Sequence, residues 1–230
     1  MQFNIEYLLY MLPAIILSLI AQAYVNSAYK KWSQVRNYLN ITGADAARRL
    51  LPAIGLNNVS LQGTSGVLSD HYDPRNNVLK LSAGVANQPS VAALAITAHE
   101  LGHADQDKDN YLPLRLRSAI VPIVSIGSNL GWIMILIGIA LQISGLAWVG
   151  VIAFSAGALF SLVTLPVELN ASKRAIAMLK DNGLVVNEQE EKGVRKVLNA
   201  AALTYVAALA NSLLQLLYFG SMVKGMNRRS

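Results

Sequence analysis

Residues that can bind and use a metal ion stand together in the sequence AHELGHA at positions 98–104. On a helix, His99 and His103 lie four residues apart, so both imidazoles leave the same face one turn apart. This spacing suits two nitrogen ligands at about 2.0–2.1 Å from one Zn²⁺ ion. Glu100 follows the first ligand, where its carboxylate can accept a proton from a zinc-bound water. The HExxH pattern therefore predicts a zinc hydrolase with one Zn²⁺ ion.

The sequence around the motif favours the helix that this chemistry requires. Within residues 91–104 no glycine precedes Gly102, and the last proline before the motif is Pro89. HExxH indicates a metalloprotease only when it lies on a helix. We therefore expect a helix over residues 91–104, with the two histidines on one face.

A zinc hydrolase holds its ion by three protein ligands and leaves a fourth position open. Glu168 is the only acidic residue between Asp109 and Asp181, and it ends a long apolar run where an unpaired carboxylate is costly. Pro166 favours a helix start just before Glu168. We predict that Glu168 is the third ligand; a first-turn acid favoured by the helix dipole is the alternative. Ser172, one turn further on, is a predicted hydrogen-bond partner for a ligand or for Glu168.

A tetrahedral oxyanion needs a further donor. His71 is the third and last histidine, and all three fall within residues 71–103. We expect His71 to contact substrate or to stabilise the oxyanion; an exposed or structural histidine is the alternative. Arg174 and Tyr72 are the other candidates for the oxyanion donor, and the sequence does not choose among the three.

Three aspartates follow the motif at residues 105, 107 and 109. Their spacing resembles that of a calcium loop, but the glycine and the distal glutamate of such a loop are missing. We expect a solvated polar exit from the helix.

Together these residues resemble the bacterial and archaeal membrane-bound neutral zinc metallopeptidases, the YugP-like family. The resemblance covers residues 8–219 and rests on the hydrophobic layout and on four motifs: TGAD at 42–45, SDHYDPR at 69–75, HELGH at 99–103 and ELNAS at 168–172. The chain is more distantly similar to the HtpX and CAAX-processing gluzincins, in which a Glu-x-x-Ala-Asp segment supplies the third ligand. This chain has Ser172 where those proteins have aspartate. The resemblance implies a membrane-bound, gluzincin-like zinc endopeptidase with Glu168 as third ligand.

The composition indicates an integral membrane protein. The 230 residues are 53% hydrophobic and 14% charged, with a mean hydropathy of +0.39. A net charge of +6 would suit nucleic acid, but the basic residues lie beside apolar segments, which is typical of topology determinants. We therefore expect a lipid bilayer and no nucleic acid as partners. The absence of cysteine excludes thiol catalysis and cysteine-ligated zinc.

Apolar segments divide the chain into six parts. These are a first span at 5–25, a zincin-like catalytic segment at 26–117, a second span at 119–141, a third at 146–165, a third-ligand helix with a cytoplasmic segment at 166–197, and a fourth span at 198–220. Residues 142–145 between the second and third spans allow only a tight helical hairpin. The fourth segment carries several polar residues, which could join helices or place it as an amphipathic helix in the interface.

The first span also has to be weighed as a signal peptide, because AQA at 21–23 imitates a cleavage site. No Lys or Arg precedes the span, and Lys30 and Lys31 follow it. This order of charges keeps the C-terminal flank in the cytoplasm, so we expect a retained anchor.

The periodicity changes between the first span and the motif. Residues 58–62, 66–72 and 78–82 alternate like short strands, with turn-forming residues at 73–77. Thr42 is the predicted N-cap for a helix through Leu51. The fold class is therefore a mainly α integral membrane protein, with about four transmembrane helices and a zincin-like core that carries a small antiparallel β-sheet. An edge strand, at 66–72 or 78–82, could hold an extended substrate.

Basic residues predict the orientation. Segment 26–117 holds ten Lys and Arg and segment 166–197 holds six, against three beyond residue 220. The positive-inside rule makes the charge-rich face cytoplasmic. We expect a multi-pass protein of the plasma membrane with its active site on the cytoplasmic side, near the bilayer surface. Its substrate would be a peptide or a membrane protein; the cleavage preference and any self-association are not predicted.

The sequence predicts a zinc endopeptidase that uses a zinc-activated water with Glu100 as general base. One alternative is a site-2-type intramembrane protease, but residues 91–98 are too short for a span and Asp105 follows closely. The other is an inactive zinc-binding scaffold or chaperone-like protein. A purely structural zinc site has no use for an acid such as Glu100 between its ligands, which favours the enzyme.

Overall fold

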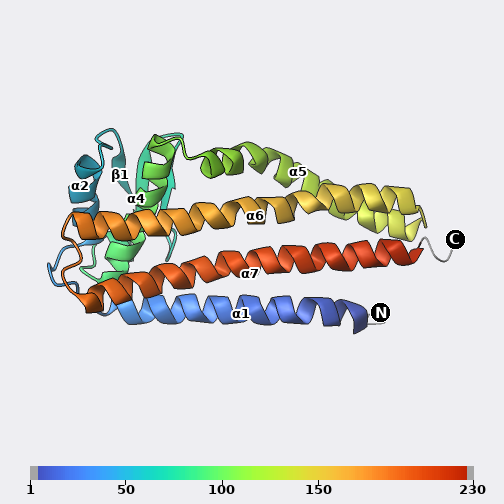
Figure 1. Cartoon of the computed structure of the whole chain (residues 1–230), viewed down its shortest axis with the longest axis horizontal. Coiled ribbons are helices and arrows are strands. Elements are labelled where there is room, and N and C mark those ends of the chain that lie inside the picture. Colours follow the sequence, from blue (N-terminus) through green and yellow to red (C-terminus); the bar gives the residue numbers. More distant parts are fainter. Residues whose placement is uncertain (1–4, 227–230) are drawn as a thin grey trace. The chain divides into compact units, whose positions relative to one another are not determined.

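The structure is a computed structural model and describes residues 5–226, with side chains from residue 8 onward (Figure 1). The chain forms two compact units. The described residues 5–21, 115–166 and 204–226 make up the first, here called the spanning unit; residues 22–114 and 167–203 make up the second, here called the site unit. In chain order the elements are α1 (Ile5–Ser33), α2 (Gly43–Ala53), β1 (Ser60–Thr64), β2 (His71–Asp73), β3 (Val78–Ser82), α3 (Ala83–Ala86), α4 (Val91–Lys108), α5 (Leu112–Ala140), α6 (Ser144–Asp181) and α7 (Glu188–Met226).

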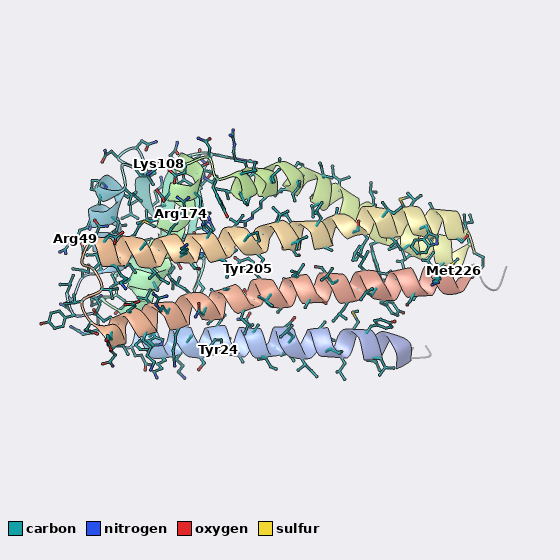
Figure 2. All side chains as sticks on the ribbon, viewed as in Figure 1. Tyr24, Arg49, Lys108, Arg174, Tyr205 and Met226 are labelled. Atoms are coloured by element: carbon teal, nitrogen blue, oxygen red, sulfur yellow. The ribbon has the colours of Figure 1, made fainter. Side chains whose placement is uncertain are left out.

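Four helices within residues 5–226 are long and apolar enough to cross a membrane, namely α1, α5, α6 and α7. Their large apolar side chains face outward, as the sticks of Figure 2 illustrate. Leu9 and Ile152 are each 69% exposed and Ile123 is 65% exposed. Such exposure is unfavourable in water and favourable in hydrocarbon. The predicted fold class, a mainly α membrane protein with about four spans and a small sheet, is confirmed.

Within the spanning unit, α5 and α6 approach backbone to backbone at glycines. A Cβ on Gly131 would lie 2.6 Å from the backbone nitrogen of Phe154, and one on Gly138 would lie 2.5 Å from that of Ala147. Small residues at such contacts are how membrane helices gain close packing. The two helices are joined by the tight turn at Gln142, whose φ is +59°.

Two helices continue beyond the predicted boundaries. The predicted helix start at Pro166 is wrong, because α6 runs through this proline without interruption. Proline removes one backbone donor but is tolerated inside apolar helices, where neighbouring helices compensate. Helix α7 begins ten residues before the fourth apolar segment, since Asn187 caps its first turn by accepting from the Glu190 N–H at 2.9 Å. Hydropathy marks the apolar part of a helix and not its ends.

The sheet of the site unit has the order β1-β3-β2 and is mixed. Strand β2 pairs antiparallel with β3, but β1 pairs parallel with it, so the expectation of a wholly antiparallel sheet is wrong. The predicted strand at 66–72 shrinks to His71–Asp73 because Gly66 (φ +103°) and Leu68 (φ +55°) leave the extended conformation. The chain therefore crosses past β3 before it turns back, which places β1 and β3 in the same direction.

Helices α2 and α4 begin where their capping residues predict. Thr42 and Asp45 form a reciprocal capping box at α2, which confirms the predicted N-cap. The Ser90 hydroxyl accepts from the Ala93 N–H at 3.1 Å and starts α4, so the predicted helix at 91–104 is also confirmed. The core of the site unit joins these helices to the central strand and α6 through fully buried side chains: Leu50, Leu79, Leu81, Leu94, Leu101 and Leu179.

Candidate metal centre

The two histidines of the motif and Glu168 converge within the site unit. Helix α4 presents both imidazoles and α6 presents the carboxylate. Nε2 of His99 lies 3.2 Å from Oε2 of Glu168, and Nε2 of His103 lies 3.4 Å from the same oxygen. One ligand atom from each of the three residues lies within 4.8 Å of the others. The residues predicted as ligands from the sequence are thus brought together.

The donor set fits a zinc ion. Ligands at about 2.0–2.2 Å in tetrahedral geometry stand about 3.3 Å from one another, which matches the two separations between the imidazoles and the carboxylate. Glu168 is only 2% exposed, and a carboxylate in such a place needs nearby positive charge. Two imidazole nitrogens and one carboxylate oxygen form the ligand set of a catalytic zinc with an open position.

The second ring nitrogen of each histidine also has a partner. Nδ1 of His99 lies 3.2 Å from the hydroxyl oxygen of Ser172. Nδ1 of His103 lies 3.1 Å from Oε1 of Gln106. Such partners orient a metal-binding imidazole and raise its basicity. Ser172 was predicted from its helical spacing to Glu168, whereas Gln106 was missed.

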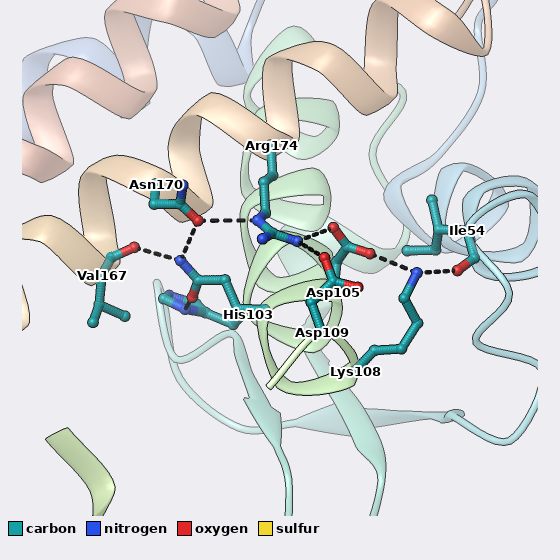
Figure 3. Close-up of polar contacts among 9 residues, drawn as sticks. Ile54, His103, Asp105, Lys108, Asp109, Val167, Asn170 and Arg174 are labelled. Carbon is teal, nitrogen blue, oxygen red and sulfur yellow. Dashed lines mark hydrogen bonds and ion pairs between the residues drawn. The ribbon is translucent and has the colours of Figure 1, made fainter. Parts of the chain in front are cut away.

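Gln106 belongs to a series of hydrogen-bonded polar groups between α4 and α6, which also includes Asn170 and Arg174, both labelled in Figure 3. Its Nε2 donates to the Val167 carbonyl at 2.8 Å and to Oδ1 of Asn170 at 3.0 Å. The same Oδ1 accepts from Nε of Arg174 at 2.9 Å. Gln106 lies three residues after His103, and Arg174 lies four after Asn170, so helical spacing was the available signal.

The aspartates after the motif form a solvated exit only in part, because Asp109 is exposed but Asp105 and Asp107 are half-buried. One nitrogen of Arg174 lies 2.5 Å from Asp105 and 2.6 Å from Asp109, and Asp107 accepts from the Tyr72 hydroxyl at 3.2 Å. The expectation therefore holds for the exposed Asp109 and is wrong for Asp105 and Asp107, and each of the three carboxylates has a partner that lies far away in the sequence. Periodicity within one segment carries no information about such partners.

Glu100 is tied to the edge of the sheet. Its Oε2 accepts from the backbone N–H of Tyr72 in β2 at 3.1 Å. Burial raises the pKa of the Glu100 carboxyl above its ordinary value, with the two imidazoles acting in the opposite direction. A divalent cation at the three ligands would also favour the ionised carboxylate. The arrangement holds a carboxylate beside the candidate metal site with one oxygen fixed by the backbone.

The three candidates for the oxyanion donor have different surroundings. Arg174 pairs with the aspartates described above. The Tyr72 hydroxyl contacts Asn77 and Asp107, both at 3.2 Å, and burial with the nearby aspartate raises the pKa of Tyr72 to about 12. His71 is exposed on β2, next to the residue that bonds Glu100, and its Nδ1 lies 2.8 Å from the Ser69 carbonyl oxygen. Of the three candidates, His71 and Tyr72 lie on β2, the strand whose backbone contacts Glu100.

Close approach of the two ligand-bearing helices depends on Gly102. A Cβ at this position would lie 2.5 Å from the backbone oxygen of Ala171. No side chain larger than hydrogen fits without moving one helix. Gly102 precedes His103, so this contact sets the separation between α4 and α6 at the candidate metal site.

The chain is similar to known proteins over most of its length. Residues 7–224 match the family model described as "Putative neutral zinc metallopeptidase". The chain is 44% identical over 208 residues to the "Putative membrane protease YugP" of Bacillus subtilis (strain 168), covering 90% of this chain and 92% of that protein. No solved structure matches the chain.

Proposed function

Because the chain belongs to the family of neutral zinc metallopeptidases, we propose that it is a membrane-bound zinc endopeptidase of the gluzincin type. The observation that carries this proposal is the convergence of His99, His103 and Glu168, with Glu100 beside them. These four residues are the parts that an HExxH hydrolase with a carboxylate third ligand needs.

Each residue has a distinct task in this proposal. His99, His103 and Glu168 would hold the ion, which when bound supplies Lewis-acid polarisation of the scissile carbonyl and of the attacking water. Glu100 accepts a proton as the water oxygen adds to the carbonyl carbon. It then gives that proton to the leaving nitrogen as the carbon–nitrogen bond breaks, so the carboxylate is regenerated. The Tyr72 N–H holds the Glu100 carboxylate in place throughout.

The proposed substrate is an extended peptide or a flexible segment of a membrane protein. Strand β2 is an edge of the sheet, and its residue Tyr72 contacts Glu100. A peptide laid along this edge would pair with backbone groups and carry a carbonyl toward the three ligands. The other strand considered as an edge from the sequence, Val78–Ser82, is the central strand β3 and is not a candidate.

We further propose that the site faces the cytoplasm from the plasma membrane, close to the bilayer. The support is the count of 16 basic residues in segments 26–117 and 166–197, against three beyond residue 220. Single cysteines at Asn76 and Asn187 test this orientation in a chain with no native cysteine. Modification by an impermeant thiol reagent added outside intact cells would overturn it.

The decisive experiment is Glu100→Gln. Purified full-length protein should bind one zinc per chain in both forms, while cleavage of labelled denatured casein falls by about 10²–10⁴-fold in the variant. A matched Asn76→Gln variant in the exposed turn after β2 should retain full activity. Unchanged cleavage in Glu100→Gln would exclude Glu100 as general base, and a wild-type protein that binds zinc but cleaves nothing would favour the scaffold alternative.

The site-2-type alternative is less well supported. Helix α4, which carries the motif, is not among the four helices of residues 5–226 that could cross a membrane. Its first turns are buried by protein side chains of the site unit.

A further inference from the structure

The Gln106 side chain contacts His103, a proposed zinc ligand on α4, and the backbone beside Glu168, the proposed ligand on α6. It is fully buried. Its Oε1 faces Nδ1 of His103, and its Nε2 faces the carbonyl of Val167, the residue before Glu168. All the groups involved belong to the site unit.

Arg174 fixes the donor and acceptor roles in the series of hydrogen bonds that runs through Asn170 and Gln106 to His103. Arg174 can only donate, so the Asn170 atom that faces its Nε at 2.9 Å must be the amide oxygen. That oxygen and the Val167 carbonyl can only accept, so Gln106 must turn its amino group toward both. The amide oxygen of Gln106 is therefore left to face His103.

This direction decides which nitrogen of His103 carries the proton. An amide oxygen can only accept, so Nδ1 of His103 must be the protonated nitrogen. The lone pair of the neutral ring is then on Nε2, the nitrogen that faces Glu168 at 3.4 Å. His99 lacks this constraint, because the Ser172 hydroxyl beside its Nδ1 can donate or accept.

We propose that Gln106 is a positioning residue of the metal centre, which holds His103 in its Nε2-binding tautomer through a chain of hydrogen bonds anchored at Arg174. The inference rests on the proposed function, since it assigns a role toward the ion that the three ligands would hold. Arg174 accordingly acts through Asn170 and Gln106, and its two aspartates hold the guanidinium in place.

Zinc affinity is the first test, measured on the full chain in detergent by competition with a chromophoric chelator. Gln106→Met keeps the length of the side chain but removes both the acceptor and the donor, and it should weaken zinc binding by about 10–100-fold. Asn170→Asp keeps an oxygen for both Arg174 and Gln106, whereas Asn170→Leu removes it. The leucine variant should lose about ten-fold in zinc affinity and the aspartate variant clearly less.

A spectroscopic measurement separates positioning from general support of the fold. The chain has three histidines, so nitrogen-15 labelling of histidine gives few signals. In the zinc-loaded wild type His103 should bind through Nε2 with a protonated Nδ1, and this proton should exchange faster in Gln106→Met. The control is Asn37→Leu, which removes a buried amide that bonds the Ile41 backbone elsewhere in the site unit. It should lower the melting temperature and leave zinc affinity unchanged.

The outcomes are distinguishable. A wild-type protein that binds no zinc contradicts the proposed function itself. Wild-type zinc binding together with unchanged affinity and an unchanged His103 signal in Gln106→Met overturns the role of Gln106. If Gln106→Met does not fold, equal zinc affinities of Asn170→Asp and Asn170→Leu would contradict the claim that hydrogen bonds from Arg174 through Asn170 position Gln106. An equal loss of zinc affinity in Asn37→Leu would also overturn the proposal, because it would show that destabilising the site unit is enough to weaken zinc binding.

Discussion

Helix α6 packs against α5 in the spanning unit and against α4 in the site unit, and the two contacts are built differently. Both use glycine to bring backbones together, at Gly131 and Gly138 in the first and at Gly102 in the second. The α4 contact also contains a buried chain of donors and acceptors, which includes Gln106 and Asn170. Small residues alone set a distance between helices. Directional bonds also set the orientation of the side chains, which a metal site requires.

The largest expected effect comes from removing Glu168, the proposed third ligand. Glu168→Ala should weaken zinc binding by more than about 100-fold, beyond the range for a partner of a ligand. Metal analysis of the purified protein measures it. Thr164→Ala, a buried position one turn earlier on the same helix but in the spanning unit, should retain its zinc. Full zinc retention in Glu168→Ala with loss in His71→Ala would transfer the third-ligand role to His71.

A pair of glycine substitutions compares the two contacts directly. Gly102→Ala and Gly138→Ala each place a Cβ 2.5 Å from backbone on α6, so each should cost about 1–3 kcal/mol of overpacking, partly offset by the better helix propensity of alanine. Both should lower the melting temperature. Only Gly102→Ala should also weaken zinc binding, by about ten-fold, because it separates His103 from Glu168. Equal zinc affinities in the two variants would show that the α4 contact does not set the site.

Ser172→Ala tests the less constrained histidine. It removes the partner of Nδ1 of His99, which a water molecule can replace more easily than the buried amide at His103. Zinc affinity should fall by about ten-fold or less, at the lower end for such partners. Chelator competition measures it beside Gln106→Met. A larger loss in Ser172→Ala than in Gln106→Met would reverse the order of the two supports.

The smallest effect is expected from the polar contact in the spanning unit. The hydroxyl oxygens of Ser161 and Ser212 lie 3.2 Å apart between α6 and α7. Such bonds between membrane helices contribute about 0.6 kcal/mol on average, so Ser161→Ala should lower the melting temperature slightly. Zinc affinity should not change. A measurable loss of zinc in this variant would mean that the two units are coupled through α6.

The convergence of His99, His103 and Glu168 and the four apolar spans could be predicted because each is encoded locally. Two histidines four residues apart must share a helix face, and a long apolar run must be buried in lipid or protein. Glu168 stood out as an isolated acid beside such a run. Gln106 and Asn170 did not stand out, since neither is charged and the hydrogen bond between them joins positions 64 residues apart. The parallel pairing of β1 with β3 was not predicted, because the strand patterns do not give the order β1-β3-β2 in which the strands lie side by side.

The contact at Gly102 restricts which sequences can carry this motif. HExxH is written with two free positions, but in this protein neither is free. Leu101 is fully buried in the core of the site unit, so its position calls for a large apolar side chain, and the Ala171 backbone leaves only a hydrogen atom's space at the next position. A saturation library at these two positions should therefore return a five-residue signature, His-Glu, a large apolar residue, Gly-His, whose specificity for this fold exceeds that of the general pattern.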